Sequence, residues 1–454
     1  MPHNRRVSLT YPQALAALQS RGRFGIHLGL ARTRALLAAL GHPERSFRGA
    51  LIGGTNGKGS SLALVESALQ AAGYRVGSTP KPHLVTYRER LQIGGVPVDP
   101  ETFARLAEKA LSLADRVARR HGEPTEFELL TAIVFAWFAQ VGIDVALVEV
   151  GLGGRLDATH AWDGGVAAIT NVALDHTDRL GSTVEAIAHE KAAIVMRGDL
   201  AVTGASGPAL AVIERRARRV GAPLTVVGPA PLLEMDRDGI VVELPGMGSV
   251  RVGLRGRHQA ANVAVADATL DALARAGIAS VSGEQRRAGY ASVRWPGRLE
   301  LLEVRGREVL LDGAHNPAGA AALAEAVDDL EQSLAGGRST LVLAVMADKD
   351  VDGVIGALAT SRALRGARVI CTAPAIARAL PPDRLAERWA AVAGSKARAV
   401  PEVAKALEAA LGEGKGPIFV AGSLYLVGAT RSLLLPDPRF EPDPPPAIPE
   451  APVP

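Results

Sequence analysis

Short apolar runs alternate with longer amphipathic segments along nearly the whole of this 454-residue chain. A short apolar run bounded by glycine or polar residues predicts a buried strand, and apolar residues on a helical period predict a helix. The predicted strands are 50–53, 145–150, 166–170, 200–203, 224–227, 309–312, 341–345, 369–372 and 418–421. The predicted helices are 60–72, 126–140, 184–195, 317–330 and 401–411. This alternation indicates an α/β protein with doubly wound, mainly parallel sheets.

The length of the chain allows two or three domains, each with a core of its own. A Pro-Gly pair at 296–297 interrupts the pattern before a new strand begins at Leu299. We therefore predict a P-loop-type, doubly wound domain over residues 1–295 and a smaller, Rossmann-like C-terminal α/β domain over 298–435. Residues 436–454 consist largely of Pro, Asp, Glu and Ala and cannot bury a core, so a disordered tail is predicted there.

The composition, with 48% hydrophobic and 22% charged residues, is typical of a soluble globular protein. The net charge of +4 is small and no aromatic residues interleave with a basic stripe, so we expect no nucleic-acid partner. The longest apolar stretch, 129–143, is short for a membrane span, and no signal peptide is recognisable at the start. The single cysteine, Cys371, cannot form an intramolecular disulfide, which favours the cytoplasm. We also expect a monomer.

A glycine-rich loop with one lysine, residues 53–61, lies between the first predicted strand and its helix. The glycines let backbone N–H groups approach an anion, while the helix N-terminus and Lys58 add positive charge, so the loop predicts a nucleotide-phosphate site. Only eight of the 51 Lys and Arg residues are lysines, which makes a lysine among small residues informative. The spacing departs from the standard P-loop because position 52 is isoleucine, and a loop without a ligand is the alternative.

Three charged or titratable residues follow the strands and helices next to this loop. Glu149 lies at the carboxyl end of a predicted strand, where a carboxylate suits Mg²⁺; a pair with Arg155 is the alternative. His176 follows the next strand; a core or capping histidine is more common, and the position beyond a strand end adds support for a metal ligand. Lys191 has small and apolar neighbours, so burial favours a neutral amine that reacts with CO₂ to form a carbamate; a surface charge is the alternative.

The C-terminal half repeats the arrangement of strand, turn and helix at residues 309–317. Asp312 lies at the carboxyl end of the strand, and His315 follows in the turn, so both are candidates to face a ligand. Asn316 is interpreted as a helix cap or a ligand contact, because Pro317 suits the first turn of a helix.

These segments, in this order, resemble the folylpolyglutamate synthase and dihydrofolate synthase family, within the larger group of Mur ligases. The resemblance covers roughly residues 8–430. The matching pieces are 54–60, 82–84 with 89–90, 125–128, 147–159, 173–181 with 190–192, 296–298, 312–317 and 422–425.

The resemblance implies an ATP-dependent acid–amino-acid ligase. ATP would convert a pterin carboxylate into an acyl phosphate, which the amino group of L-glutamate attacks, releasing ADP and phosphate. Dihydrofolate synthesis, polyglutamylation of reduced folates, or both are compatible with the sequence. A Mur-type ligase with a non-folate substrate and a non-catalytic ATP-binding paralogue are the alternatives.

The resemblance also assigns roles to individual residues. It is compatible with a monovalent cation as a further cofactor. The implied ATP-binding residues are Gly54, Thr55, Asn56, Gly57, Lys58, Gly59, Ser60, Asn262, Arg298 and Asp312. The implied ligands of two Mg²⁺ ions are Ser60, Glu149, His176 and Lys191, the last as a carbamate. The implied pterin and glutamate residues are Lys81, Pro82, His83, Phe127, Asp157, His315 and Ser423. The implied catalytic group is Lys58, Glu149, His176, Lys191 and His315.

Two positions depart from the family pattern. Lys81 stands where the family usually has a serine that binds metal, and a protonated lysine cannot coordinate Mg²⁺. We expect either that the Lys81 ammonium contacts phosphate or a substrate carboxylate directly, or that the first metal takes another water. His160 stands where the family commonly has asparagine, beside the presumed pterin loop, so the substrate preference stays open there.

Overall fold

The structure is a computed structural model that describes residues 9–24 and 29–443. Contacts within the chain divide it into two compact units, which are described separately. Unit 1 takes the chain up to Val227, then Asp267–Val281 and Asp443, and unit 2 takes Gly228–Ala266 and Ser282–Pro442. Residues 228–266 thus group with the C-terminal part of the chain. The domain boundary predicted from the sequence at 296–297 stays a prediction.

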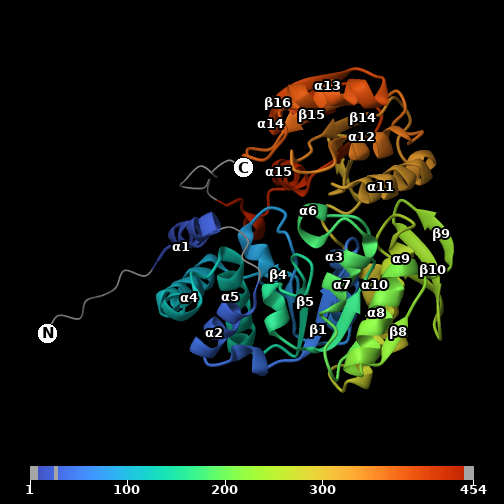
Figure 1. The fold of residues 1–454 in the computed structure, drawn as a ribbon. Coiled ribbons are helices and arrows are strands. Elements are labelled where there is room, and N and C mark those ends of the chain that lie inside the picture. Colours follow the sequence, from blue (N-terminus) through green and yellow to red (C-terminus); the bar gives the residue numbers. More distant parts are fainter. Residues whose placement is uncertain (1–8, 25–28, 444–454) are drawn as a thin grey trace. The chain divides into compact units, whose positions relative to one another are not determined.

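Unit 1 is built on an eight-stranded sheet with the strand order β4-β3-β2-β5-β1-β6-β7-β8 (Figure 1). The six strands from β2 to β8 in this order are parallel, and β3 and β4 add an antiparallel edge. The strands are β1 (Gly49–Gly53), β2 (Val76–Thr79), β3 (Gln92–Ile93), β4 (Val96–Pro97), β5 (Val145–Glu149), β6 (Gly165–Ile169), β7 (Leu200–Thr203) and β8 (Leu224–Val226). Because β1 lies between β5 and β6, the turns that follow these three strands meet at one edge.

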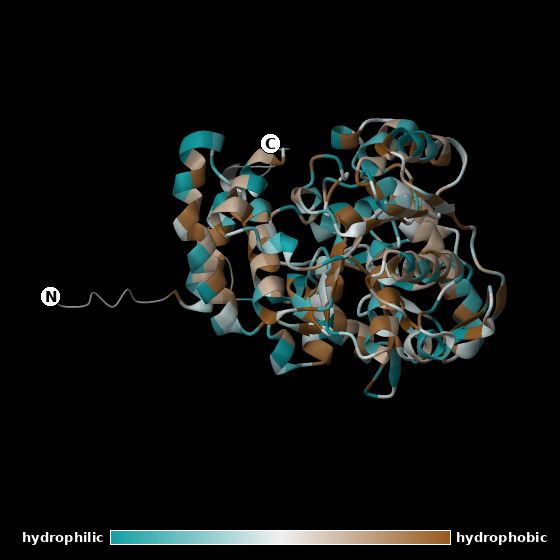
Figure 2. Ribbon diagram, turned by 90° about the horizontal axis from the view of Figure 1, so that it is seen from below, coloured by the Kyte–Doolittle hydropathy of each residue, from teal (hydrophilic) through white to brown (hydrophobic). Residues whose placement is uncertain are grey.

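The helices of unit 1 form groups that pack against one another. Helices α1 and α2 each pack on α4 and α5, α4 packs on α5, and α7 packs on α8 (Figure 1). These helices are α1 (Tyr11–Gln19), α2 (Ala31–Ala39), α3 (Lys58–Ala71), α4 (Pro100–His121), α5 (Glu126–Val141), α6 (Thr177–Leu180), α7 (Val184–Ala192) and α8 (Gly207–Val220). Short 3₁₀ turns are η1 (Ser20–Phe24), η2 (Pro43–Arg45), η3 (Tyr87–Arg90) and η4 (Ala158–Ala161). Hydrophobic and hydrophilic residues alternate along the helical ribbons, as expected for half-buried helices (Figure 2).

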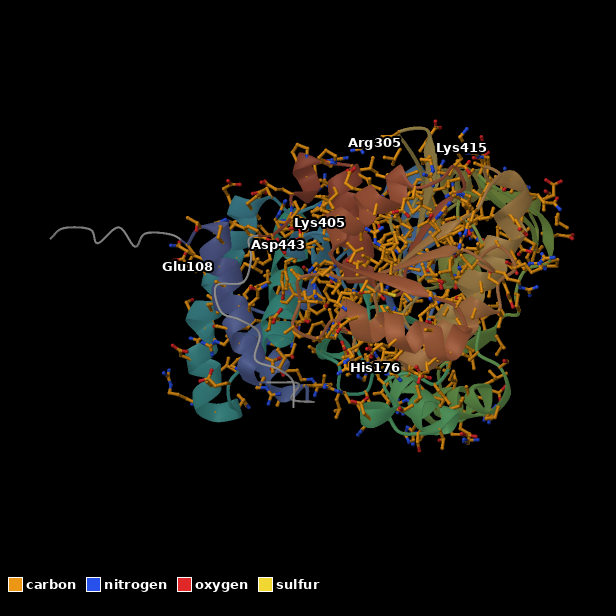
Figure 3. All side chains as sticks on the ribbon, turned by 90° about the horizontal axis from the view of Figure 1, so that it is seen from above. Glu108, His176, Arg305, Lys405, Lys415 and Asp443 are labelled. Carbon is orange, nitrogen blue, oxygen red and sulfur yellow. The ribbon has the colours of Figure 1, made fainter. Side chains whose placement is uncertain are left out.

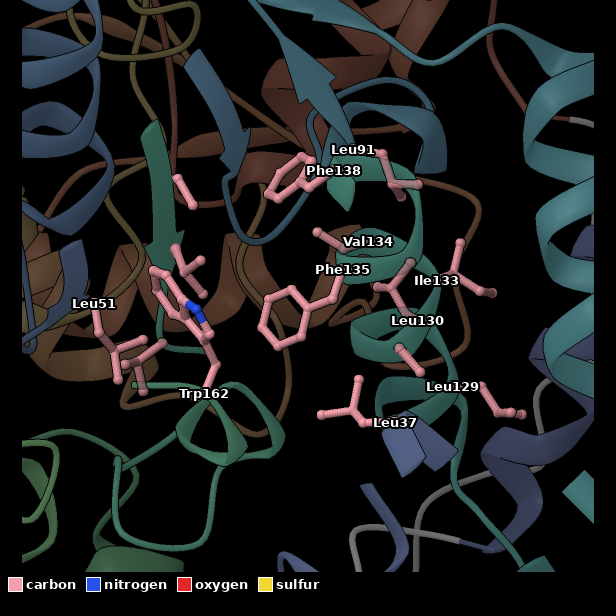
Figure 4. Packing of buried hydrophobic residues seen from close by; sticks show 14 of the residues in the cluster. Leu37, Leu51, Leu91, Leu129, Leu130, Ile133, Val134, Phe135, Phe138 and Trp162 are labelled. Atoms are coloured by element: carbon pink, nitrogen blue, oxygen red, sulfur yellow. The ribbon is translucent and has the colours of Figure 1, made fainter. Parts of the chain in front are cut away.

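The apolar stretch 129–143 is the centre of the unit 1 core. It forms α5, whose Phe135 packs on Trp162 with ring centroids 5.9 Å apart (Figure 4). Phe47 meets both rings, with centroids 5.8 Å from Phe135 and 5.7 Å from Trp162. The interpretation of this stretch as a buried helix is therefore confirmed. Among the described residues, no helix is both long and apolar enough to cross a bilayer.

Unit 2 contains a six-stranded mixed sheet with the order β12-β13-β17-β14-β15-β16 and a separate three-stranded antiparallel sheet, β11-β10-β9. In the larger sheet β12 pairs antiparallel with β13, and the remaining strands are parallel. The strands are β9 (Leu232–Asp236), β10 (Gly239–Leu244), β11 (Gly248–Val252), β12 (Glu300–Val304), β13 (Arg307–Leu311), β14 (Thr340–Leu343), β15 (Arg368–Ala373), β16 (Ala397–Glu402) and β17 (Ile418–Ala421).

Helices α11, α12 and α13 pack in sequence on one another, and α14 packs on α15, which gives the doubly wound arrangement. The remaining elements are α9 (Gln259–Arg275), α10 (Gly283–Ser292), α11 (Pro317–Leu330), η5 (Glu331–Ser333), α12 (Val351–Ala359), α13 (Pro382–Ala393), α14 (Val403–Gly412), α15 (Leu424–Leu434) and η6 (Pro438–Phe440). The α/β fold class with two mainly parallel or mixed sheets is thus confirmed.

Three features differ from the sequence-based expectations. The helix predicted from residue 401 begins at Val403, because the strand β16 continues through Pro401 to Glu402. The antiparallel sheet β9–β11 was not predicted from the sequence. The start of the predicted tail is ordered by η6 and by hydrogen bonds to Asp443, and the rest of the tail, 444–454, lies outside the described residues.

Candidate active site

The glycine loop after β1 forms the predicted turn between strand and helix. Helix α3 begins at Lys58, and Gly57 precedes it in the left-handed region with φ of 81°. Gly54 has φ of 138°, and a Cβ atom there would lie 1.9 Å from the Thr170 hydroxyl oxygen. Both the backbone conformation and the close approach of the β6 turn therefore require glycine at position 54.

The turn after β6 braces this loop. The main-chain N–H of Thr55 donates to the Asn171 carbonyl at 2.9 Å, and that of Asn56 donates to the Asn171 side-chain oxygen at 3.0 Å. The Thr170 hydroxyl donates to the Asn56 carbonyl at 2.6 Å, and the Ala173 N–H donates to the Thr55 hydroxyl at 3.1 Å. These hydrogen bonds therefore hold the two turns together. This role of Thr170 and Asn171 was not predicted from the sequence.

Two ammonium groups converge on one carbonyl of the loop. Lys58 Nζ donates to the carbonyls of Gly54 at 3.2 Å and Thr55 at 3.0 Å, and Lys191 Nζ donates to Gly54 at 2.9 Å. Burial, followed by the charge of Lys58, lowers the pKa of Lys191 to about 7. Lys191 is thus a buried residue in contact with the phosphate loop, and the alternative of a surface charge is wrong.

Glu149, at the end of β5, connects this loop with Lys81. Its Oε1 lies 4.0 Å from Lys58 Nζ, and its Oε2 accepts a hydrogen bond from the Lys81 main-chain N–H at 2.9 Å. Lys81 Nζ donates to the Glu149 carbonyl at 2.6 Å. Burial lowers the pKa of Lys81 to about 8, against the opposing effect of the Asp157 and Glu149 carboxylates. The alternative pair between Glu149 and Arg155 is not formed, since Arg155 pairs with Glu190 at 2.8 Å.

The residues predicted to bind the pterin meet around Gly151. Lys81 Nζ lies 5.5 Å from the centroid of the Phe127 ring. A Cβ atom on Gly151 would lie 2.9 Å from the Phe127 ring and 3.1 Å from Asp157 Oδ2. Lys81, Phe127 and Asp157 therefore lie close together, although they come from the turn after β2, the first turn of α5 and the residue before η4.

Asp157 has a structural role that the sequence did not reveal. Its Oδ2 accepts hydrogen bonds from the N–H groups of Gly151 at 3.1 Å and Leu152 at 2.9 Å. Its Oδ1 accepts from the N–H of Thr159 at 3.0 Å and from its hydroxyl at 2.5 Å. An ionised carboxylate offers about four acceptor positions, so Asp157 orders the turn before η4. Its contact with a pterin stays a prediction.

His160, the second departure from the family pattern, follows this turn. Its Nδ1 pairs with the Arg155 carbonyl at 2.9 Å, while its Nε2 is buried without a hydrogen-bond partner among the described residues. Burial lowers the pKa of the ring, which favours the neutral form.

The loop that carries His83 is ordered by a buried carboxylate. Glu89 accepts hydrogen bonds from three successive N–H groups, those of Leu84, Val85 and Thr86, at 2.7–2.9 Å. Thr86 and Glu89 have the spacing of a capping box, which is the signal that predicts this role. The order of this loop decides where His83 lies.

Arg90 then sets the state of His83. Arg90 Nε donates to His83 Nδ1 at 2.9 Å, so that ring nitrogen is an acceptor. Burial and the charge of Arg90 hold the pKa of His83 well below its usual value. Tyr87 stacks near His83, with centroids 5.5 Å apart, and donates its hydroxyl to Glu126 at 2.8 Å. A neutral His83 is therefore part of a buried polar network beside the predicted pterin residues.

The fit of the implied metal ions depends on the oxygen donors. Mg²⁺ bound to a nucleotide needs only one or two carboxylates, because phosphates and waters complete its shell. Glu149 supplies such a carboxylate at a strand end next to the loop, and the buried Ser60 lies in the first turn of α3. Among the described residues no group of three His, Cys, Asp or Glu side chains gathers into a metal site. The donor set therefore fits a metal held jointly with a nucleotide.

His176 lies in the turn after β6 in the left-handed conformation, with φ of 50°, immediately before α6. Its side chain is 40% exposed, and its Nε2 lies 3.9 Å from the Asp175 carboxylate (Figure 3). His176 is thus neither a core residue nor a side-chain cap of the helix, and a role as a metal ligand stays a prediction.

In unit 2, Asp312 and Arg298 lie together at the end of β13. Asp312 accepts hydrogen bonds from the N–H groups of Leu299 at 2.9 Å and Ala314 at 2.8 Å. A Cβ atom on Gly313 would lie 2.4 Å from the Arg298 guanidinium. Asn316 caps α11 by accepting from Gly319 at 2.7 Å, which confirms its interpretation as a helix cap.

The start of α9 lies beside this pair. The half-buried His258 interacts electrostatically with Asp312 and Arg298, and desolvation of its ring lowers its pKa. Asn262 follows one turn later on α9 and donates to the Gln259 side chain at 2.8 Å. The three unit 2 residues predicted to bind ATP, Asn262, Arg298 and Asp312, therefore belong to one neighbourhood.

His315 and Ser423, the residues predicted to lie near glutamate, are in two neighbouring turns. His315 Nδ1 pairs with the Gly313 carbonyl at 2.8 Å, which requires a proton on Nδ1. Ser423 is buried and accepts from the Tyr425 N–H at 3.1 Å as the N-cap of α15. A Cβ atom on Gly313 would lie 2.3 Å from Leu424, so the turns after β13 and β17 are in contact.

Comparisons with known proteins agree with this arrangement. Residues 52–270 match the Mur ligase middle domain, and residues 297–424 match the Mur ligase glutamate ligase domain. The dihydrofolate synthase/folylpolyglutamate synthase of Bacillus subtilis is 36% identical over 360 residues, which cover 77% of this chain and 83% of that protein. The folylpolyglutamate synthase of Lacticaseibacillus casei is 30% identical, over 94% of this chain and 99% of that protein.

Solved structures share the fold over nearly the whole chain. Mycobacterium tuberculosis folylpolyglutamate synthase, complexed with ADP and AMPPCP, superimposes with a TM-score of 0.84 at 33% identity, over 93% of this chain and 99% of that one. Escherichia coli FolC in complex with DHPP and ADP gives a TM-score of 0.79 at 30% identity, over 92% and 97%. With the phosphate loop, the strand-end carboxylates and the extent of these matches, the chain belongs to the folylpolyglutamate and dihydrofolate synthase family of ATP-dependent ligases that add glutamate to folates.

Proposed function

We propose that this chain joins L-glutamate to the carboxylate of a pterin or folate at the expense of ATP. The observation that carries the proposal is the convergence of Lys58, Lys191 and Glu149 on the glycine loop, within 4.0 Å of their nearest partners there. A carboxylate is a poor electrophile, so the reaction needs positive charge that holds a triphosphate and an acid side by side.

The nucleotide is held by the glycine loop 54–60, with Lys58 on the terminal phosphates; the N–H groups of Thr55 and Asn56 donate to Asn171, so other N–H groups of the loop face the phosphates. In this structure Lys58 lies over the carbonyls of Gly54 and Thr55, and exchanging these acceptors for phosphate oxygens needs only a side-chain rotation. The family resemblance supports assigning Asn262, Arg298 and Asp312 to ATP as well.

Ser60, Glu149, His176 and a carbamylated Lys191 would hold two Mg²⁺ ions. When bound, the ions would supply Lewis-acid stabilisation of phosphate charge. Formation of the carbamate requires a neutral amine, and a Lys191 pKa of about 7 supports this step. A crystal of the loaded protein, or ¹³CO₂ NMR, tests the modification; unmodified lysine at saturating bicarbonate with both metals bound contradicts it.

The reaction then proceeds in two balanced steps. A substrate carboxylate oxygen attacks the γ-phosphorus, ADP departs, and an acyl phosphate forms. The glutamate nitrogen attacks the carbonyl carbon, the C–O bond to phosphate breaks, and the nitrogen loses a proton. With a proton on Nδ1, the lone pair of His315 is on Nε2, and we assign that atom to accept the proton.

The function is tested by phosphate release and mass spectrometry of the product. Purified protein with Mg-ATP and glutamate is given either dihydropteroate or tetrahydrofolate, and we expect ADP, phosphate and a new amide with at least one of them. The ratio of the two initial rates separates dihydrofolate synthesis from polyglutamylation. A rate of phosphate release that does not depend on either pterin favours a Mur-type ligase with another substrate. ATP binding without turnover favours a non-catalytic paralogue. A monomer in the cytoplasm is also proposed.

A further inference from the structure

The carboxyl edge of the unit 2 sheet carries an arginine that the assigned site does not use. The turns after β13, β17, β14 and β15 are neighbours, because these strands are adjacent and parallel. Ligands in such sheets bind beyond the carboxyl ends of the strands. Arg378 lies in the turn between β15 and α13, two strands away from β17 and the buried Ser423.

The main chain around Arg378 is held in place. Ala347 N–H donates to the Arg378 carbonyl at 2.9 Å, and Leu380 N–H donates to the Val345 carbonyl at 3.0 Å. An isolated bridge joins Met346 with Ala379. The turn after β15 is therefore paired with the turn after β14, and Arg378 projects from an ordered backbone.

The guanidinium of Arg378 is held by Tyr425. Its NH2 donates to the Tyr425 hydroxyl at 2.7 Å, and its Cζ lies 5.0 Å from the centroid of the ring. Tyr425 N–H in turn donates to the Ser423 hydroxyl oxygen at 3.1 Å. A continuous series of contacts therefore leads from Arg378 through Tyr425 to Ser423, the residue assigned to the glutamate.

Arg378 retains hydrogen-bonding capacity that other arginines of this unit have used. Arg388 and Arg305 each donate to both carboxylate oxygens of a partner, Asp352 and Glu408 respectively. The carboxylate nearest to Arg378, that of Asp348, lies 3.8 Å from NH1, beyond hydrogen-bond distance. A guanidinium has five N–H donors, and within the described residues Arg378 uses one of them. Its side chain is 41% exposed, so a solute reaches it.

We propose that Arg378 binds a carboxylate of the incoming L-glutamate, with Tyr425 fixing the plane of the guanidinium. The inference rests on the proposed function. A guanidinium fork matches a carboxylate with two parallel hydrogen bonds, which a single ammonium does not offer. Binding a carboxylate here orients glutamate along the turns of β15 and β17, towards Ser423.

The charges favour a carboxylate over a phosphate chain at this position. Asp348 lies beside the guanidinium and repels a polyanion more strongly than a group of single charge. The nucleotide is also accounted for by Asn262, Arg298 and Asp312, none of which has a hydrogen bond to Arg378 among the described residues. Nucleotide binding is nevertheless one outcome of the test.

The test measures steady-state constants for all three substrates with Arg378→Ala and Arg378→Lys. We expect the KM for glutamate to rise about 10–100-fold in Arg378→Ala, as for loss of a charge-assisted pair of hydrogen bonds, with the KM values for ATP and pterin within about twofold. Arg378→Lys keeps the charge but loses the fork, so an intermediate value is expected. Arg388→Ala is the matched control, since that side chain is 46% exposed and paired with Asp352, and it leaves the glutamate KM unchanged.

A second measurement replaces one carboxylate of glutamate at a time. Glutamine lacks the side-chain carboxylate, and isoglutamine lacks the α-carboxylate. In the unaltered protein, the analogue that lacks the group bound by Arg378 has the lower kcat/KM of the two. In Arg378→Ala, we expect the ratio of kcat/KM between the two analogues to fall by about tenfold or more. The analogue series with Arg378→Lys and Tyr425→Phe serves if Arg378→Ala does not fold, because Tyr425→Phe keeps the ring and removes only the hydroxyl partner.

The inference is overturned if Arg378→Ala leaves both the glutamate KM and the discrimination between analogues unchanged. It is also overturned if the ATP KM rises instead, because Arg378 would then serve the nucleotide. Failure of the proposed function is a different result, in which the unaltered protein forms no glutamate amide with either pterin.

Discussion

At the scale of single residues, the site depends on positions where the surrounding structure requires one particular amino acid. Gly54 has no space for a Cβ atom, Glu89 satisfies three successive N–H groups, and Asp157 accepts four hydrogen bonds. Gly54 and Asp157 were both expected from the sequence, but only as residues that contact a ligand. Their structural contacts were not predictable, because the partners, Thr170 among them, are distant in the chain.

Gly54→Ala is expected to disrupt the phosphate loop. The added Cβ overlaps Thr170 and requires a φ of 138°, which costs about 1–3 kcal/mol in strain and displaces the N–H groups that face the nucleotide. We expect ATP affinity, measured by isothermal titration, to fall by about tenfold or more. Gly228→Ala is the control, because no atom lies within 4 Å of a Cβ there; equal affinity in both variants would contradict the prediction.

Lys81→Ser is expected to change the dependence of turnover on Mg²⁺. The Lys81 ammonium contacts the Glu149 carbonyl at 2.6 Å and adds a positive charge beside the carboxylate assigned to the metal. Serine removes that charge and offers an oxygen ligand, so tighter Mg²⁺ binding by titration of the nucleotide complex is expected. Lys109→Ser, on the solvent side of α4, is the control. An identical Mg²⁺ titration for Lys81→Ser and the parent protein excludes this role.

At the scale of elements, buried charges hold the ends of helices and loops. Arg307, at the start of β13, donates to the carbonyls of Ala410, Leu411, Glu413, Gly414 and Gly416. These carbonyls lie at and after the end of α14, where a helix leaves its last C=O groups without internal partners. A cation there also interacts favourably with the helix dipole.

Arg307→Leu is therefore expected to lower the free energy of unfolding by about 3 kcal/mol, because several buried carbonyls lose their donor. Arg307→Lys should recover part of the loss through its charge. Urea denaturation measures both. Arg305→Ala, two residues earlier and on an exposed side chain (Figure 3), is the control and should leave the midpoint nearly unchanged.

Asp443 has a comparable role for the loop that carries η3. Its carboxylate accepts from the Tyr11 hydroxyl at 2.5 Å, the Thr86 hydroxyl at 2.8 Å and the Tyr87 N–H at 2.7 Å. Burial and Asp443 together raise the pKa of Tyr11, so its hydroxyl stays a donor. The segment predicted to be disordered thus contains an anchor for the loop beside His83.

Asp443→Ala is expected to speed hydrogen exchange at the Tyr87 amide by about tenfold, since this amide loses a charge-assisted hydrogen bond. We also expect a higher KM for the pterin. Asp437→Ala in the same segment is the control, because among the described residues Asp437 forms its hydrogen bonds with Arg439, two positions away. Exchange at Tyr87 that is the same in both variants argues against an anchor.

At the scale of the whole molecule, stability responds to buried carboxyl groups. Asp199 is 3% exposed, and burial together with Asp163 raises its pKa to about 7. In the unfolded chain an aspartate titrates near pH 4. The folded state therefore binds more protons between these values, and the stability present below about pH 4 is lost as the pH rises towards 7.

Asp199→Asn removes this dependence because the amide carries no charge at any pH. We expect the melting temperature of Asp199→Asn relative to the parent to be higher at pH 8 than at pH 5, as measured by calorimetry across that range. Asp115→Asn, on a side chain that is 80% exposed, is the control and should follow the parent at every pH. A constant difference between Asp199→Asn and the parent would contradict the pKa shift.

Local pattern determined much of this protein. The spacing of apolar residues was sufficient to predict the bounds of strands β7 and β17 and of helix α11. A buried strand or helix face requires apolar side chains at fixed intervals. The order of the motifs was sufficient to recognise the family and to locate the glycine loop at 54–60.

Only the tertiary structure decided which partners these residues have. The contact of Lys191 with Gly54 and the pairing of Arg378 with Tyr425 join positions that are far apart in sequence, and so does the grouping of residues 228–266 with the C-terminal part of unit 2. Such contacts depend on strand order and on which loops meet at a sheet edge. Hydrophobic periodicity specifies the face of an element that is buried, but not the neighbour that covers it.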